Sequence, residues 1–224
     1  ARVAMAMSGG VDSSVAAALL KEQGHEVIGL HMKLYHGPEN EKRPKSCCSL
    51  DEAIGARTAC HRLDIPFYVL DYQKEFRELV IDYFVNEYSH GSTPNPCVTC
   101  NKKIKGDLLI KKVDELDCDY LATGHYARIS FDQETGRSQL ARPQDLRKDQ
   151  TYFLHGITAH ELQRLMFPLA DIIKPEVRKI ASKLNLSAAK KPDSQEICFV
   201  PKDYRIYLKQ ELSQVPESGE FVSV

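Results

Sequence analysis

Short apolar segments alternate with longer amphipathic segments over the first 124 residues of the chain. Val3 to Met7, Glu26 to Leu34, Phe67 to Leu70 and the segment DYLATG (119–124) are typical of buried strands. Helical periodicity fills the intervals between them, at residues 12–23, 49–64, 73–88 and 101–115. Because parallel strands need long crossover connections, usually helices, this alternation predicts an α/β fold with a doubly wound, mainly parallel sheet and helices on both faces.

After Gly124 the pattern changes. Residues 126–142 predict a hairpin that turns at Glu134 to Gly136, and helices are expected at Ala159 to Leu165 and at Pro175 to Leu184, the second with a proline in its first turn. We therefore expect a helical extension beyond the sheet. The final residues, VPESGEFVSV, resemble the start of a strand, so we expect the chain to stop inside another module.

Composition narrows the class of protein. With 42% hydrophobic and 27% charged residues among 224, the chain can bury its own core, and no apolar run reaches the roughly 18 residues needed to cross a membrane. Seven cysteines are an odd number in a chain too large for a disulfide scaffold, which favours catalytic, metal-binding or buried thiols and a cytoplasmic location. Since the formal charge is only −1, a polyanionic partner would have to bind local patches.

A glycine-rich turn lies between the first predicted strand and the first predicted helix, in the sequence AMSGGVDSS (6–14). Ligands bind at this position in open parallel sheets, and glycines, hydroxyls and helix N-terminal amides together form a phosphate cradle. The turn lacks the lysine and the spacing of a Walker loop. The structural alternative is a tight turn at Gly9 and Gly10 with Asp12 as a helix cap.

This turn and six further segments resemble the N-type ATP pyrophosphatases and, within them, the tRNA-specific 2-thiouridylases of the MnmA type. The segments are GLHMKLY, IPFYVLDY, GSTPNPCVTCNKKIKG, ATGHYARI, KDQTYFL and SQEICFV, in the family's order from residue 4 to about residue 200. The resemblance implies a Rossmann-like PP-loop catalytic domain over residues 1–200. We expect residues 201–224 to begin a central module, and the family's C-terminal β-barrel to be absent from this chain.

The resemblance also implies an activity. The family cleaves ATP to AMP and pyrophosphate with Mg²⁺, adenylating the C2 oxygen of a tRNA uridine so that sulfur can replace it, and the expected target is the wobble position. Residues implied to bind the nucleotide are Ala6, Met7, Ser8, Gly9, Gly10, Val11, Asp12, Ser13, Met32 and Gly124.

Two cysteines match the family's reactive pair. Cys198 is implied to carry a persulfide received from a sulfur-donor protein, and Cys100 to release the sulfur and form a disulfide with Cys198. We expect Cys100 at the start of the helix that begins near Asn101, where the helix N-terminus and nearby lysines favour a thiolate. Without the resemblance, Cys198 would be interpreted as a core residue, and the pair Cys97 and Cys100 as a redox or metal-binding motif.

Cys97 departs from some family members, which carry an aspartate there. With Cys97, Cys100 and Cys198 together, an iron–sulfur cluster is an alternative route for the same reaction. Two other functions stay open: a PP-loop synthetase of the amidotransferase type acting on a small molecule, and a non-enzymatic redox or metal-binding module.

For tRNA binding, the resemblance places Asn95, Pro96 and Cys97 near the target base, and Lys148, Asp149 and Gln150 on the tRNA. Cationic clusters that could contact its phosphates are Lys102, Lys103, Lys105, Lys111 and Lys112, and Arg142, Arg147 and Lys148. For Lys111 and Lys112 an ordinary solvated helix face is the preferred interpretation. Five further residues have weaker functional signals. Cys60 and Cys118 are predicted to be core residues, Cys47 and Cys48 to be loop residues, and His125 to line a pocket or pack in the core.

Overall fold

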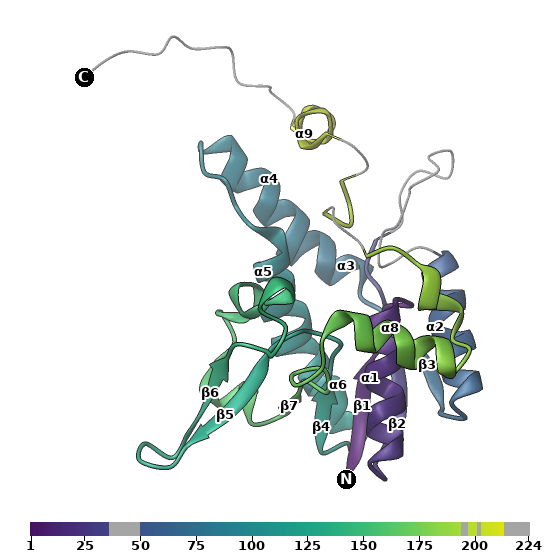
Figure 1. Cartoon of the computed structure of the whole chain (residues 1–224). Helices are drawn as coiled ribbons and strands as arrows, with labels where there is room; N and C mark the ends of the chain where they lie inside the picture. The colour runs from purple at the N-terminus through teal and green to yellow at the C-terminus, as the bar shows by residue number, and fades with distance from the viewer. Residues whose placement is uncertain (36–49, 194–196, 201–202, 213–224) are drawn as a thin grey trace.

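A five-stranded parallel sheet forms the centre of the structure, a computed structural model that describes residues 1–35, 50–193, 197–200 and 203–212 (Figure 1). The strand order is β3-β2-β1-β4-β7, and all four neighbouring pairs are parallel. The strands are β1 (Arg2–Ala6), β2 (Glu26–Lys33), β3 (Phe67–Asp71), β4 (Tyr120–Ala122) and β7 (Leu165–Met166). The predicted fold class, a doubly wound parallel sheet, is confirmed.

Alternating side chains of β1 contribute to two different cores. Val3 and Met5 pack into a cluster that includes apolar residues of α1 (Val11–Glu22), α2 (Leu50–Arg62) and α8 (Lys174–Lys183). Ala4 and Ala6 pack on the opposite face, in a cluster that includes Val113 of α6 (Ile110–Glu115). Since successive side chains of a strand point to opposite faces, β1 is apolar throughout because both of its faces are covered.

The first two helices, α1 and α2, begin and end close to the predicted positions. Gly24, with φ +83°, follows α1 as expected of a left-handed helix end. Cys60 of α2 is fully buried, and burial raises the pKa of its thiol to about 12, which confirms it as a core residue. Cys118 is buried as well.

Two predicted helices contain π-helical segments. The predicted helix 73–88 consists of α3 (Gln73–Phe76), the π-helical η1 (Arg77–Ile81) and α4 (Asp82–Ser89). The predicted helix 101–115 is wrong at its start, because α5 (Pro96–Cys100) precedes the π-helical η2 (Asn101–Leu109) and α6. Asn95 caps α5 and Pro96 occupies its first turn, a helix-starting pair that outweighs the preceding run of loop residues.

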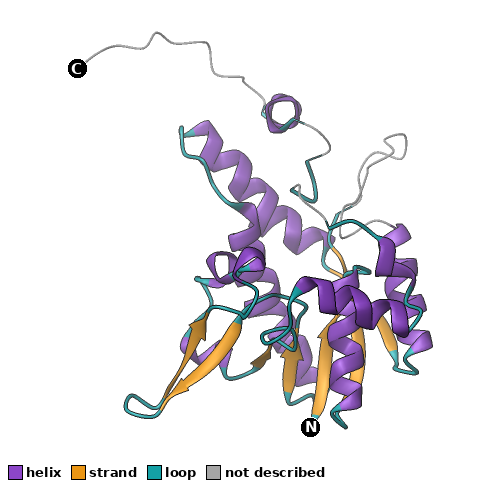
Figure 2. Cartoon of the chain, in the orientation of Figure 1, coloured by secondary structure: helices purple, strands orange, loops and turns teal. Residues whose placement is uncertain are grey.

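The second half of the chain adds a hairpin and short helices (Figure 2). The hairpin forms as predicted, from β5 (Arg128–Asp132) and β6 (Arg137–Ala141) with its turn at residues 133–136. The helix predicted at 159–165 is shorter, because Leu165 and Met166 leave it and join the sheet edge next to β4. Other short elements are η3 (Leu146–Lys148), η4 (Thr151–Leu154), α7 (Ala159–Leu162) and η5 (Ser187–Lys190).

A third core, which we call the aromatic cluster, lies outside the sheet and contains Phe76, Phe84, Phe199 and Tyr207. Phe199 contacts each of the other three rings at centroid distances of 5.3–5.8 Å. Tyr207 belongs to α9 (Tyr204–Glu211), so this helix packs against the α3 to α4 arm. Where the structure describes them, the residues predicted to begin a further module thus share a core with helices of the preceding part of the chain.

The predictions for Cys47, Cys48 and the tail 215–224 lie outside the described residues. Among the described helices, none has the length and apolar character required to cross a membrane.

Candidate functional site

The direction in which the chain adds strands to the sheet reverses between β1 and β4. From β1 the chain proceeds to β2 and β3 on one side, and later to β4 and β7 on the other. Such a switch point leaves a crevice outside the carboxyl ends of the two strands, where open α/β sheets bind ligands. The turn after β1 and the residues after β4 both lie at this edge, and Met32 lies near the same end of β2. Three segments predicted to bind nucleotide are therefore brought together by the sheet.

Gly9 has a backbone that other residues adopt with difficulty. Its φ is +78°, and a Cβ atom there would lie 2.2 Å from the carbonyl oxygen of Glu52 in the first turn of α2. No side chain fits in that space, so the turn requires glycine for both its dihedral angle and its contact with α2.

Hydroxyl groups hold the turn around the N-terminus of α1. The Ser8 amide donates to Ser13 Oγ at 3.3 Å, and the Ser13 and Ser14 hydroxyls both donate to the Gly10 carbonyl oxygen. Gly10 is the N-cap residue and provides no side-chain acceptor for the first-turn amides of α1. Backbone N–H groups at an uncapped helix N-terminus can bind an anion.

Gly124, one of the residues predicted to bind the nucleotide, makes a close contact within the chain. A Cβ atom at Gly124 would lie 2.7 Å from the Ser13 amide nitrogen and 2.9 Å from the Asp12 carbonyl carbon. The absence of a side chain lets the segment after β4 touch the first turn of α1, so Gly124 supports the glycine-rich turn that precedes this helix.

Asp12 is held by two residues that the sequence interpretation missed. Lys174 Nζ lies 2.7 Å from each carboxylate oxygen of Asp12, and the Tyr126 hydroxyl donates to Asp12 Oδ1 at 2.9 Å. Burial, and next to it the charge of Asp12, raises the pKa of Tyr126, so the phenol stays neutral and donates. Lys174 precedes Pro175 in the first turn of α8, where the helix dipole disfavours a cation. This unfavourable position is visible in the sequence and could have marked Lys174 as a functional residue.

Asp193 extends this group of charges. Its carboxylate pairs with Lys174 at 2.8 Å, with Lys148 at 2.7 Å and with Arg178 at 2.9 Å. Burial disfavours the charged form of Asp193, yet hydrogen bonds from Lys148 and Lys174 outweigh burial and lower its pKa to about 2. No sequence pattern marked Asp193, since its partners are distant in the chain.

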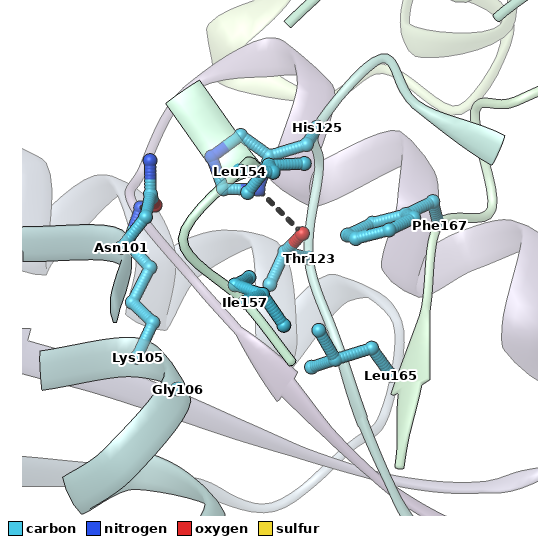
Figure 3. A pocket seen from close by; sticks show the side chains of 9 residues that line it. All are labelled: Asn101, Lys105, Gly106, Thr123, His125, Leu154, Ile157, Leu165 and Phe167. Atoms are coloured by element: carbon cyan, nitrogen blue, oxygen red, sulfur yellow. Dashed lines mark hydrogen bonds between the residues drawn. The ribbon is translucent and has the colours of Figure 1, made fainter. Parts of the chain in front are cut away.

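His125 lines a small pocket beside this site (Figure 3). Its Nδ1 shares a hydrogen bond of 2.7 Å with Thr123 Oγ1, and Lys105 and Asn101 lie on the opposite wall. Burial, reinforced by the positive charge of Lys105, lowers the pKa of His125 well below 6.5. The imidazole is therefore neutral at physiological pH. His125 both lines this pocket and packs edge-on against Phe167, at a ring-centroid distance of 6.2 Å.

The helix that begins at Pro96 changes the positions of two cysteines. Cys97, rather than Cys100, lies in its first turn, where Asn95 Oδ1 accepts hydrogen bonds from the Cys97 and Val98 amides at 3.0 and 3.4 Å. Cys100 is the last residue of α5, immediately before the π-helical η2. The expectation that Cys100 starts a helix is wrong, because Asn95 and Pro96 begin it one turn earlier.

Cys100 and Cys198 pack against the same aromatic cluster, although they come from segments far apart in the chain. Met32, near the carboxyl end of β2, packs on this cluster too, and also on the core that contains Ala4 and Ala6. Among the described residues no three His, Cys, Asp or Glu side chains are arranged to hold a metal ion. Cys97, Cys100 and Cys198, all described, thus do not form a cluster site in this conformation.

The residues predicted to contact tRNA make bonds within the chain. Lys148 pairs with Asp193, and Asp149 accepts from Arg142 at 2.6 Å. The Gln150 side-chain oxygen accepts from the Tyr126 amide, while the Gln150 amide donates to the Tyr126 carbonyl. This segment therefore positions Tyr126, and through it Asp12.

The expected cationic clusters are partly neutralised. Lys103 pairs with Asp107, Lys112 with Glu115, and Lys105 Nζ donates to Asn101 Oδ1 at 2.8 Å. Lys111 is exposed on α6. The solvated-face interpretation of Lys111 and Lys112 agrees with these positions.

Comparisons with known proteins give one consistent group of relatives. The family model described as the tRNA methyl transferase HUP domain matches residues 1–202. The chain is 48% identical over 222 residues to the tRNA-specific 2-thiouridylase MnmA of Clostridioides difficile, and 51% identical over 227 residues to that of Geobacter metallireducens. Each alignment covers 99% of this chain but only 62% and 61% of the respective relative, so the chain spans about three fifths of their length.

Among solved structures, a 4-thiouridine synthetase–RNA complex with bound ATP aligns with a TM-score of 0.51 and 14% sequence identity, covering 94% of this chain and 50% of that one. A glutamine-dependent NAD⁺ synthetase from Acinetobacter baumannii aligns with a TM-score of 0.50 and 14% identity, covering 86% of this chain and 32% of that one. At such identity the likeness concerns the fold.

Proposed function

The chain belongs to the family of the tRNA methyl transferase HUP domain, and from that premise we propose that it catalyses the ATP-dependent 2-thiolation of a tRNA uridine, at the wobble position. The observation that carries the proposal is the packing of Cys100 and Cys198 on one cluster, joined through Met32 to the sheet edge that bears the phosphate loop. The 2-thiouridylase relatives support the same conclusion.

The first step makes the C2 oxygen a good leaving group. The uridine oxygen attacks the α-phosphorus of ATP, a P–O bond breaks, and pyrophosphate departs with the electron pair. The amides of the first turn of α1 and the Ser8 hydroxyl would stabilise the charge that develops on the phosphates. Mg²⁺ is commonly held by one or two carboxylates together with phosphate oxygens, and Asp12 is the carboxylate placed beside this turn.

The second step transfers sulfur. The terminal sulfur of a Cys198 persulfide attacks C2, and AMP leaves with the C–O electron pair. The Cys100 thiolate then attacks the Sγ of Cys198, the persulfide S–S bond breaks, and its electrons form the thiocarbonyl of the product. The product enzyme holds a Cys100–Cys198 disulfide, which an external thiol must reduce before a sulfur-donor protein reloads Cys198. This requirement is why we place the reaction in a reducing compartment such as the cytoplasm.

We assign the target base to the start of α5. Asn95, Pro96 and Cys97 form the helix start one turn before Cys100, which supports placing the base there. Because C2 of a paired uridine is inaccessible, the substrate has to be extruded from an RNA loop. We propose that Lys148, Asp149 and Gln150 contact the tRNA; Lys148 and Asp149 are only partly buried.

The experiment that tests the function is a single-turnover thiolation assay after anaerobic purification, with tRNA, MgATP and a persulfide donor, alongside iron and sulfide analysis. We expect 2-thiouridine and one AMP per thiolated base without stoichiometric iron. Iron that the activity requires would replace the persulfide route with a cluster held by Cys97, Cys100 and Cys198. Pyrophosphate release that depends on a small amino or carboxylate substrate, with no need for tRNA, would contradict thiolation and indicate an amidotransferase-type synthetase.

A further inference from the structure

The glycine-rich turn at residues 6–14, which we call the phosphate turn, has no lysine in its own sequence, yet the fold places one beside it. Lys174 is separated from Asp12 by 162 positions, and its Nζ lies 2.7 Å from both oxygens of the Asp12 carboxylate. Asp12 lies in the first turn of α1, directly after Gly10 and Val11. The ammonium group is therefore beside the helix end at which the phosphates would bind.

Lys174 is held in an unusual environment for a lysine. Its side chain is 9% exposed, its Nζ lies 5.7 Å from the centroid of the Tyr126 ring, and its own amide donates to Asp145 Oδ2 at 3.0 Å. Lysines are almost never this buried unless paired, and a cation in the first turn of a helix is opposed by the helix dipole. Such local conflicts concentrate at functional sites.

The group of charges around Lys174 can accept an anion. Two carboxylates, Asp12 and Asp193, face three cations, Lys148, Lys174 and Arg178. Asp193 keeps Lys148 and Arg178 as partners when Lys174 leaves it. The contact between Lys174 and Asp193 is therefore the one that can open at the smallest cost and release a donor.

We propose that Lys174 supplies the lysine that this phosphate turn lacks, and that its ammonium binds the phosphate chain of the nucleotide at the N-terminus of α1. The inference rests on the proposed use of ATP and adds a residue to it. Asp193 is a positioning residue, which holds the ammonium over Asp12 while the site is empty.

Inorganic pyrophosphate is the probe that tests this, because it measures phosphate binding without chemistry or tRNA. Calorimetric titration of the 224-residue chain with MgATP and with magnesium pyrophosphate should give binding for the wild type. Lys174→Gln should weaken both by about tenfold to a hundredfold, the scale of losing one hydrogen bond between charged groups. Lys179→Gln, on an exposed position of the same helix, is the matched control and should bind like the wild type.

A second variant separates binding from support of the fold. Asp193→Asn removes a competitor for the ammonium, so its pyrophosphate affinity should exceed that of the wild type. This increase decides the matter if Lys174→Gln does not fold, and an unchanged affinity in Asp193→Asn would then overturn the proposal. Equal losses in Lys174→Gln and Asp193→Asn would overturn the proposal, because they would mean that the charges only brace the turn. A wild-type chain that binds neither ligand would overturn the proposed function as well, whereas unchanged affinity in Lys174→Gln would overturn the role of Lys174 alone.

Discussion

At the scale of single residues, the proposed function assigns phosphate binding and sulfur transfer to two separate groups of side chains. Asp12 lies with Tyr126 and Lys174 at the carboxyl edge of the sheet, while Cys198 packs on the aromatic cluster. The two groups are connected through packing and share no side chain. Their substitutions should therefore affect different steps.

Asp12→Ala should abolish adenylation, since it removes the carboxylate at the phosphate turn. Cys198→Ser should leave adenylation intact and stop sulfur transfer, because a hydroxyl cannot carry a persulfide. Pyrophosphate release and 2-thiouridine formation, measured in the same reactions, distinguish the two. Equal loss of both signals in both variants would contradict this separation.

His125 should make the fold sensitive to mild acid. Its pKa is lowered by burial and by Lys105, so below about pH 6.5 the unfolded chain binds a proton that the folded chain does not. Stability should fall as the pH decreases from 6.5 toward the lowered value. Urea unfolding of the wild type and His125→Gln at pH 7 and pH 5 measures the effect, which the variant should have lost. An equal decrease in both proteins would show that other groups are responsible.

At the scale of elements, the start of α5 depends on one side chain. Asn95→Ala removes the acceptor for two amides and should lower the free energy of unfolding by about 1 kcal/mol. Asn95→Asp keeps an acceptor at the same place and should retain most of the stability. Urea denaturation of the three proteins is sufficient, and a stability unchanged in the alanine variant would mean that Pro96 alone sets the helix start.

The contact between β4 and α1 leaves no space for a side chain. Gly124→Ala would place Cβ 2.7 Å from the Ser13 amide, and such overpacking typically costs about 1–3 kcal/mol. ATP affinity should fall with stability, because the first turn of α1 has to move. Gly156→Ala is the control, since its Cβ would meet only the flexible side chain of Lys102, at 3.2 Å. Calorimetry and thermal unfolding should separate the two variants clearly.

At the scale of the whole molecule, Asp193 joins two elements that are distant in the chain, η3 through Lys148 and α8 through Lys174 and Arg178. Its pKa is lowered from 3.8 to about 2, so this contribution is complete above pH 3.8 and is lost as the pH falls toward 2. The loss should be on the order of 2 kcal/mol. Urea unfolding measures the decrease in the free energy of unfolding between pH 5 and pH 2. This decrease should be smaller in Asp193→Asn than in the wild type by the same amount. Parallel pH profiles would contradict the assignment.

Much of the fold follows from local pattern. The apolar segments around Val3 and Glu26 to Leu34 are strands because they are buried on both faces, and the helices between them show their own periodicity. Two errors had local causes: β7 has two residues, too few for any pattern, and the start of α5 was missed although Asn95 and Pro96 signal it. The family resemblance singled out Cys100 and Cys198 as the expected reactive pair, which residue spacing alone would have left as core or metal-binding thiols.

The sequence by itself determined the individual strands and the glycine-rich turn after the first of them. Each of these features depends on neighbours within a few residues. Only the tertiary structure decided which charges meet. The pairing of Lys174 with Asp12 spans 162 positions, and an ammonium–carboxylate contact imposes no periodicity on the chain between its partners. The reversal of strand order between β1 and β4 brings Asp12 and Lys174 together. The glycine-rich turn therefore has a lysine beside it in the folded chain, although its own sequence contains none.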